Sequence, residues 1–187
     1  MNTEPISPLR AENLTLGYEK KVVARDLSVS IPEGKLTVII GPNACGKSTL
    51  LRTLSRLMQP QAGAVWLNGK AISEVPTKEV AKQLGLLPQS STAPGDISVA
   101  DLVARGRYPH QTLFSRWRSE DAQAVDDAMR ATGVFELADS LVDTLSGGQR
   151  QRVWIAMVLA QQTPLLLLDE PTTWLDIAHQ IDLMELM

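Results

Sequence analysis

The sequence predicts an α/β fold, and three patterns along its 187 residues support that prediction. An apolar run at Leu36–Ile40 is followed by a glycine-rich loop and then by helical periodicity over Leu50–Leu57. A second apolar run, Leu165–Leu168, ends in two adjacent carboxylates, as is typical of a buried parallel strand that ends at a ligand site. After Gln89 the strand-like patterns give way to helical ones.

The first part of the chain is predicted to form β structure. Leu9–Tyr18 and Val22–Ile31 alternate or contain β-branched residues, and a turn at 32–34 precedes a predicted strand at Lys35–Ile40. Ala64–Leu67 is a further short strand followed by the hairpin signal Asn68-Gly69. We therefore expect an N-terminal antiparallel β subdomain.

The remaining elements are predicted in the order helix, strand, helices, strand. Pro76 starts a helix that ends near Gln83, and Leu84–Leu87 is a strand. Helical patterns run through Ser119–Thr132, and Gly147–Gln162 forms a helix that Thr163-Pro164 ends. We expect one domain, 1–187, in which 1–89 hold the β subdomain and the first part of the core, 90–145 an inserted α-helical subdomain, and 146–187 the rest of the core.

Composition excludes several classes of function. The formal net charge is −3, with no block of basic residues, so nucleic acid is not an expected partner. The longest apolar run, Val153–Ala160, is far shorter than the roughly 18 residues of a membrane span. The first residues show neither a basic nor an apolar signal region, so we do not expect export. The single cysteine, Cys45, cannot form a disulfide within the chain.

The glycine-rich loop matches the phosphate-binding pattern G-x-x-x-x-G-K-[ST]. This pattern predicts a core of the P-loop NTPase type. Backbone N–H groups and the helix dipole favour an anion there. Lys47 reaches the β- and γ-phosphates, and the Ser48 hydroxyl coordinates Mg²⁺. A structural turn needs the glycines but not the Lys-Ser-Thr that follows. The predicted nucleotide-binding residues of this loop are Gly41, Pro42, Asn43, Ala44, Cys45, Gly46, Lys47, Ser48 and Thr49.

Two further segments carry the expected chemistry. Asp169 and Glu170 end a strand and point in different directions, so one carboxylate holds Mg²⁺ and the other polarises the attacking water. Alone, they are equally compatible with an acidic turn. Ser146 caps the next helix start, but a cap does not explain Gly147 and Gly148, which suggest a second contact to nucleotide.

These motifs, in this order and spacing, resemble the ATP-binding subunit of ABC transporters over nearly the whole chain. The resemblance implies ATP and Mg²⁺ as cofactors and a role for Gln89 in coupling the γ-phosphate to the helical subdomain. It also implies that Tyr18 stacks on adenine and that Asp176 lies at a dimer interface. The implied catalytic residues are Glu170, Lys47 and Gln89; the metal-binding residues are Ser48, Gln89 and Asp169; the further nucleotide contacts are Tyr18, Ser146, Gly147, Gly148, Gln149 and Asp176.

The resemblance also implies partners. Two chains would pair head to tail with ATP at the interface and would act on integral membrane permease subunits, at the cytoplasmic face of the plasma (inner) membrane. An extracytoplasmic solute-binding protein would be an indirect partner. The segments Arg105–His110 and Leu175–Gln180 are similar to those of importers for iron(III)-siderophores, haem and cobalamin, and we expect siderophore-type iron uptake.

Two departures from the family pattern bear on activity. The family has glycine where this chain has Ala44, and an alanine is harmless there only if the backbone at position 44 does not need a positive φ. We expect phosphate binding to survive, because the methyl group is small. Ile181–Met187 continues a helical pattern without a stop, so we expect a C-terminal truncation that removes a γ-phosphate histidine, which neither His110 nor His179 replaces. The alternatives are a hydrolysis-deficient nucleotide-binding fragment and a soluble, non-transport ABC ATPase.

Overall fold

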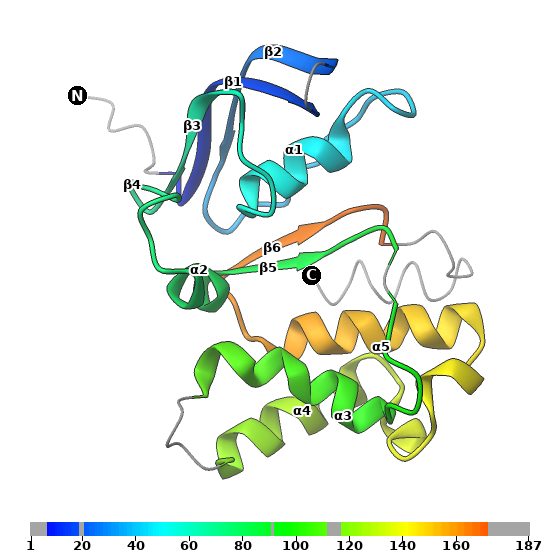
Figure 1. Cartoon of the computed structure of the whole chain (residues 1–187). Helices are drawn as coiled ribbons and strands as arrows, with labels where there is room; N and C mark the ends of the chain where they lie inside the picture. The colour runs from blue at the N-terminus through cyan, green and yellow to red at the C-terminus, as the bar shows by residue number, and fades with distance from the viewer. Residues whose placement is uncertain (1–6, 19–20, 91, 112–116, 172–187) are drawn as a thin grey trace. The chain divides into compact units, whose positions relative to one another are not determined.

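The computed structural model describes residues 7–18, 21–90, 92–111 and 117–171. The chain divides between Val80 and Ala81 into two compact units, each of which is described by itself. Figure 1 shows the helices and strands with the labels used below.

The first unit is built on a four-stranded antiparallel sheet of order β2-β1-β3-β4. Its strands are β1 (Leu9–Tyr18), β2 (Lys21–Ile31), β3 (Ala62–Leu67) and β4 (Lys70–Ala71). The β3–β4 hairpin turns at Asn68 and Gly69, whose φ angles of 49° and 79° are those of the predicted two-residue turn. Helix α1 (Lys47–Leu54) packs on β1 and buries its Leu50 and Leu54 (Figure 1). The N-terminal β subdomain is thus confirmed.

The second unit combines a two-stranded parallel sheet with a helical cluster (Figure 1). Strand β5 (Leu84–Leu87) pairs in parallel register with β6 (Leu165–Leu168), both within their predicted bounds. Helix α5 (Gly147–Ala160) packs against α3 (Val99–Ala104), α4 (Ser119–Ala131) and β5. The helices are α2 (Thr77–Gln83), which spans the boundary between the units, α3 (Val99–Ala104), α4 (Ser119–Ala131) and α5 (Gly147–Ala160), with 3₁₀ turns η1 (Arg105–His110), η2 (Phe135–Leu137) and η3 (Val142–Thr144).

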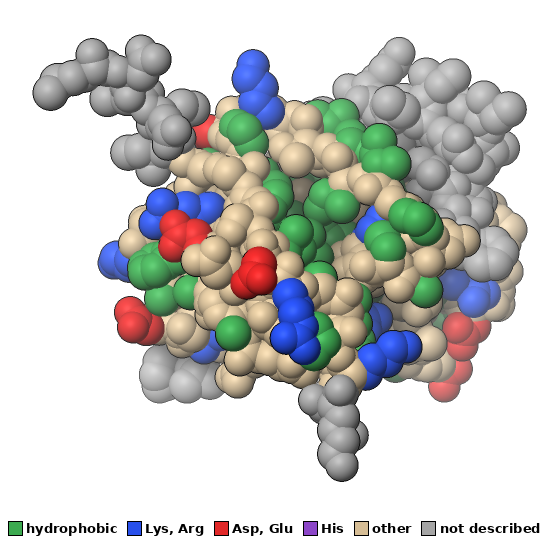
Figure 2. All heavy atoms as spheres, turned by 90° about the horizontal axis from the view of Figure 1, so that it is seen from above, with side chains coloured by type: hydrophobic (Ala, Val, Ile, Leu, Met, Phe, Trp, Pro, Cys, Tyr) green, Lys and Arg blue, Asp and Glu red, His purple; other side chains and the backbone are tan. Residues whose placement is uncertain are grey.

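The prediction of a strand at Lys35–Ile40 is wrong for this structure. The segment has no regular secondary structure, and Leu36, Val38 and Ile40 are 72%, 67% and 91% exposed. A strand is stabilised by hydrogen bonds to a neighbouring strand, and within the described ranges no strand pairs with this segment. In the view of Figure 2, hydrophobic side chains lie between charged and other polar ones on the surface. The apolar composition of the segment suits a strand, but composition alone does not show whether a neighbouring strand is there to pair with it.

Candidate functional site

The glycine-rich loop leads directly into α1, as predicted, and Lys47 is the first residue of that helix. The Lys47 ammonium donates hydrogen bonds to the carbonyl oxygens of Gly41 (2.8 Å) and Pro42 (2.9 Å). An ammonium has three N–H groups, and these bonds use two of them. The loop therefore curls around its own lysine and holds that positive charge at the start of the helix, where the helix dipole adds to it.

Space restricts both glycines of the loop, and backbone conformation restricts Gly46 as well. Gly46 has a φ of 106°, and a Cβ there would lie 2.5 Å from Cγ1 of Val23 on β2. At Gly41, a Cβ would lie 2.7 Å from Sγ of Cys45. No other residue fits either position without displacing its neighbour. The side chain of the exposed Cys45 thus lies close to the beginning of the loop, where a small side chain fits.

The backbone at Ala44 does need a positive φ, so the alanine is not free of strain. Its φ is 61°, in the left-handed region that alanine adopts at a cost of about 1–2 kcal/mol. The sequence therefore places a residue with a Cβ at a position for which glycine is better suited.

We predict that Ala44→Gly raises the free energy of unfolding by about 0.5–1 kcal/mol, because the relief of backbone strain exceeds the added freedom of the unfolded chain. Urea titration of the full-length protein measures this. The matched control is Ala122→Gly, on the exposed face of α4, which should lower stability by about 1 kcal/mol. A loss of stability at position 44 as large as that at position 122 would contradict the prediction.

Tyr18 lies at the end of β1, beside the helix that follows the loop. Its hydroxyl and the buried Thr49 hydroxyl are 3.3 Å apart, and the residue is 47% exposed. The hydrogen bond with Thr49 lowers the pKa of Tyr18; partial burial opposes this, and Arg52 adds to the lowering. An aromatic side chain is thus anchored by its hydroxyl within the unit that carries the loop.

The acidic pair follows β6 and occupies two different environments. Asp169 is only 6% exposed, and its backbone N–H donates to the carbonyl of Leu87 on β5 (3.0 Å). Glu170 is exposed, has a left-handed φ of 51°, and accepts a hydrogen bond from the Gln89 side-chain amide (2.7 Å). Strained residues of this kind are enriched at functional sites. The structure therefore brings together Gln89 and Glu170, which the sequence placed 81 positions apart.

The start of α5 forms a capping box. The Ser146 hydroxyl accepts from the backbone N–H of Gln149 (3.3 Å), and the Gln149 side chain accepts from the backbone N–H of Ser146 (3.0 Å). The predicted cap is confirmed, and Gln149 is tied into it. Ser146 and Gly147 are exposed, so the helix start remains accessible.

Sequence reasoning missed Gln151, in the second turn of α5. This buried side chain donates to the carbonyl of Pro171, the residue after Glu170 (3.0 Å). The bond links the helix that begins at Ser146 to the turn that carries the acidic pair. No local signal marked this residue, because its neighbours Arg150 and Arg152 are polar as well.

The oxygen donors predicted for magnesium suit that ion. Mg²⁺ prefers hydroxyl, amide and carboxylate oxygens. Because Gln89 uses its amide nitrogen on Glu170, its carbonyl oxygen is left as a ligand. Ser48, at the start of α1, belongs to the first unit, whereas Gln89 and Asp169 belong to the second. Across the described part of the chain, no cluster of three or more His, Cys, Asp or Glu could hold a metal by itself. Asp176 and His179 lie outside the described residues.

The glycine loop before α1 and the parallel strand that ends in the acidic pair define the class of P-loop nucleotide-binding proteins. Within that class, the chain belongs to the ABC transporter family, whose model matches residues 24–173. This confirms the resemblance, the fold class and the ABC-type ATPase inferred from the sequence.

Curated relatives and solved structures agree with this family assignment. The chain is 67% identical over 185 residues to the ferric enterobactin transport ATP-binding protein FepC of Escherichia coli (strain K12), covering 99% of this chain and 68% of that protein. It is 53% identical over 182 residues to the probable siderophore transport system ATP-binding protein YusV of Bacillus subtilis (strain 168), covering 97% and 66%.

Among solved structures, one titled as an inward-facing conformation of a putative metal-chelate type ABC transporter matches with a TM-score of 0.79 and 33% identity, over 96% of this chain and 66% of that one. An Atm1-family ABC exporter with ATP bound matches with a TM-score of 0.82 and 28% identity, over 98% and 33%. The chain spans about two thirds of the length of the curated relatives it matches.

Proposed function

We propose that the protein is the ATP-binding subunit of an importer and couples ATP binding and hydrolysis to uptake of a chelated iron compound of the siderophore type. The observation that carries the proposal is the 67% identity to FepC, which is named as a ferric enterobactin transport ATP-binding protein. The proposal is supported by the loop that surrounds Lys47 and by the Gln89–Glu170 pair.

The chain's own groups suit the hydrolytic step. Lys47 would bind the β- and γ-phosphate oxygens. Ser48, Gln89 and Asp169 are the residues that would hold magnesium, which would supply positive charge to offset that of the phosphates. Glu170 accepts a proton from water as the water oxygen bonds to the γ-phosphorus. The bond from that phosphorus to the bridging oxygen breaks, and ADP and phosphate leave. The hydrogen bond from Gln89 holds the Glu170 carboxylate in place.

The partners follow from the same proposal. Two copies pair head to tail, so that Ser146, Gly147 and Gly148 of one copy close over the ATP held by Lys47 of the other. Tyr18 stacks on the adenine. Across the ranges that the structure describes, no helix is long and apolar enough to cross a bilayer. We assign the transmembrane path to permease subunits, with this subunit at the cytoplasmic face of the inner membrane and a solute-binding protein on the other side.

Complementation tests this proposal. In Escherichia coli lacking FepC, the full-length protein should restore uptake of ferric enterobactin, measured with radioactive iron. A Lys47→Met variant, expressed to the same level, should not restore it. Uptake that stays at the background level, although the protein is expressed and binds Mg-ATP, would contradict this substrate class. Absence from membranes that contain the cognate permease would favour a soluble ABC ATPase.

A further inference from the structure

The segment Arg105–His110 is similar to the corresponding segment of iron-importer ATPases, but the sequence alone assigns it no physical role. In the structure it lies against the last turns of α5. It forms the 3₁₀ turn η1, and Gly106 is buried against the helix backbone. A Cβ at Gly106 would lie 2.2 Å from the carbonyl oxygen of Met157 and 3.2 Å from the backbone nitrogen of Gln161. Glycine is therefore required here by space, since any side chain would push the turn away from α5.

Arg107 joins this turn to two helices. Its guanidinium is buried, with 6% exposure, and its Nε donates to Oδ1 of Asp121 in the first turn of α4 (2.9 Å). Its Nη1 donates to the carbonyl of Ala160 (2.8 Å) and to Oε1 of Gln162 (2.9 Å). A buried charge is costly unless it is paired and hydrogen-bonded, so these bonds fix one arrangement of the three elements.

Asp121 is held in its charged form. Burial by itself raises the pKa of Asp121, but hydrogen bonds from Arg107 and from the backbone N–H of Arg118 outweigh it, and the pKa lies below the ordinary value. A lowered folded-state pKa stabilises the fold above the unfolded-state value of 3.8, and that stabilisation is lost as the pH falls through the folded-state pKa. The ion pair is therefore intact at neutral pH.

His110 completes the contact with the end of α5. Its Nε2 lies 2.8 Å from the carbonyl of Gln161, and because a carbonyl only accepts, Nε2 carries the proton. The Gln161 side chain in turn donates to the carbonyls of Ala81 and of Leu84, the first residue of β5. The last turn of α5 has no basic residue of its own, and η1 provides the hydrogen bonds to the carbonyls of Ala160 and of the C-cap residue Gln161.

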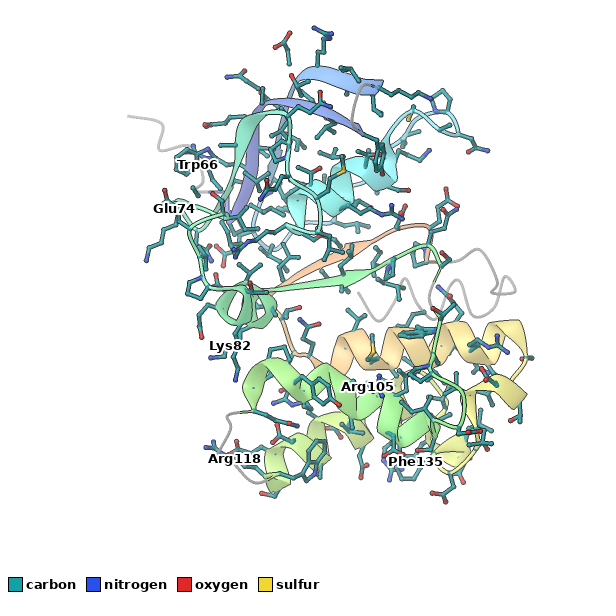
Figure 3. All side chains as sticks on the ribbon, viewed as in Figure 1. Trp66, Glu74, Lys82, Arg105, Arg118 and Phe135 are labelled. Carbon is teal, nitrogen blue, oxygen red and sulfur yellow. The ribbon has the colours of Figure 1, made fainter. Side chains whose placement is uncertain are left out.

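We propose that Arg107, His110 and Asp121, here called the C-terminal clamp, are positioning residues that fix the register of α5 and thereby place Ser146–Gly148 at its other end for nucleotide contact. This rests on the proposed role of Ser146–Gly148. A helix of 14 residues is about 20 Å long and rigid, so a rotation or slide at one end is transmitted to the other. The apolar contacts of α5 with α3 and α4 are non-directional, whereas the hydrogen bonds from Arg107 and His110 are directional and fix the rotation of the helix end. In Figure 3, Arg105 and Arg118 mark the turn before Gly106 and the start of α4.

The test separates positioning from stability in the full-length protein. Arg107→Met leaves the Asp121 carboxylate buried without its partner and should lower both the unfolding temperature and kcat, the latter by about 10- to 100-fold. The double variant Arg107→Met/Asp121→Leu removes both charges and should recover the unfolding temperature, but kcat should stay low because the bonds to Ala160 and Gln162 are still missing. The dissociation constant for Mg-ATP, measured by calorimetry, should change by less than about two-fold, because the phosphate loop is untouched.

Two controls complete the design. Arg105→Met, an exposed arginine on the same turn, should leave kcat unchanged. His110→Ala buries no unpaired charge and should lower kcat by at least about three-fold in folded protein. Recovery of kcat together with stability in the double variant, or unchanged kcat in His110→Ala, would overturn the inference. If the unaltered protein neither binds nor hydrolyses Mg-ATP, the proposed function fails instead.

Discussion

Replacing Glu170 with glutamine should lower the turnover number for ATP hydrolysis by about 10²- to 10⁴-fold and leave Mg-ATP binding largely intact. The substitution removes the base while keeping the shape of the side chain. Its remaining carbonyl oxygen still accepts the hydrogen bond that Gln89 donates to the carboxylate at 2.7 Å. The loss therefore reports on proton acceptance and not on a displaced side chain. Phosphate release from the full-length protein at saturating ATP measures it.

The matched control is Glu136→Gln, at an exposed position on η2 outside the proposed site, which should retain full turnover. Nucleotide affinity, measured by calorimetry, separates the base from a binding residue. If Glu170→Gln turns over ATP at a rate similar to that of the unaltered protein, Glu170 is not the base. If it loses affinity instead, the residue acts in binding.

Lys47→Met should weaken Mg-ATP binding by about 10- to 100-fold, since hydrogen bonds to charged groups contribute about 1.5–3 kcal/mol each. The substitution keeps the apolar stem but removes the ammonium. In the unliganded loop it also removes the bonds to the carbonyls of Gly41 and Pro42, so the loop loses the group around which it folds. Both effects act in the same direction on affinity.

Lys70→Met serves as the control, because Lys70 is an exposed lysine in the same unit, on β4. It should bind Mg-ATP as the unaltered protein does. Equal affinity in the Lys47 and Lys70 variants would remove the lysine from the phosphate site. Unfolding curves of both variants should be recorded, so that a change in affinity is assigned to folded protein.

Local patterns predicted most of the secondary structure. Strand β1 has the predicted bounds because alternation along Leu9–Tyr18 matches a sheet with one buried face. The cap at Ser146 and the turn at Asn68-Gly69 were predictable because each depends on a few neighbouring residues. The strand at Lys35–Ile40 failed because strand formation depends on a partner distant in sequence, which an apolar run does not reveal.

The loop and the acidic pair were predicted from motifs, but their supporting contacts were not. The bond from Gln89 to Glu170 and that from Gln151 to Pro171 connect distant segments. Arg107 was overlooked as well, because a charged side chain in a turn is usually solvated, and only the packing of α5 and α4 buries it. The left-handed φ of Ala44 depends on loop closure and also could not be read from composition.

The central claim is that the loop ahead of α1 binds the phosphates of ATP together with magnesium. Titration calorimetry of the full-length protein with Mg-ATP tests it most directly. The account predicts saturable heat with one nucleotide bound per chain, strongly reduced by Lys47→Met and preserved in Glu170→Gln. Folded protein that gives no heat with Mg-ATP, or equal binding after Lys47→Met, would contradict it.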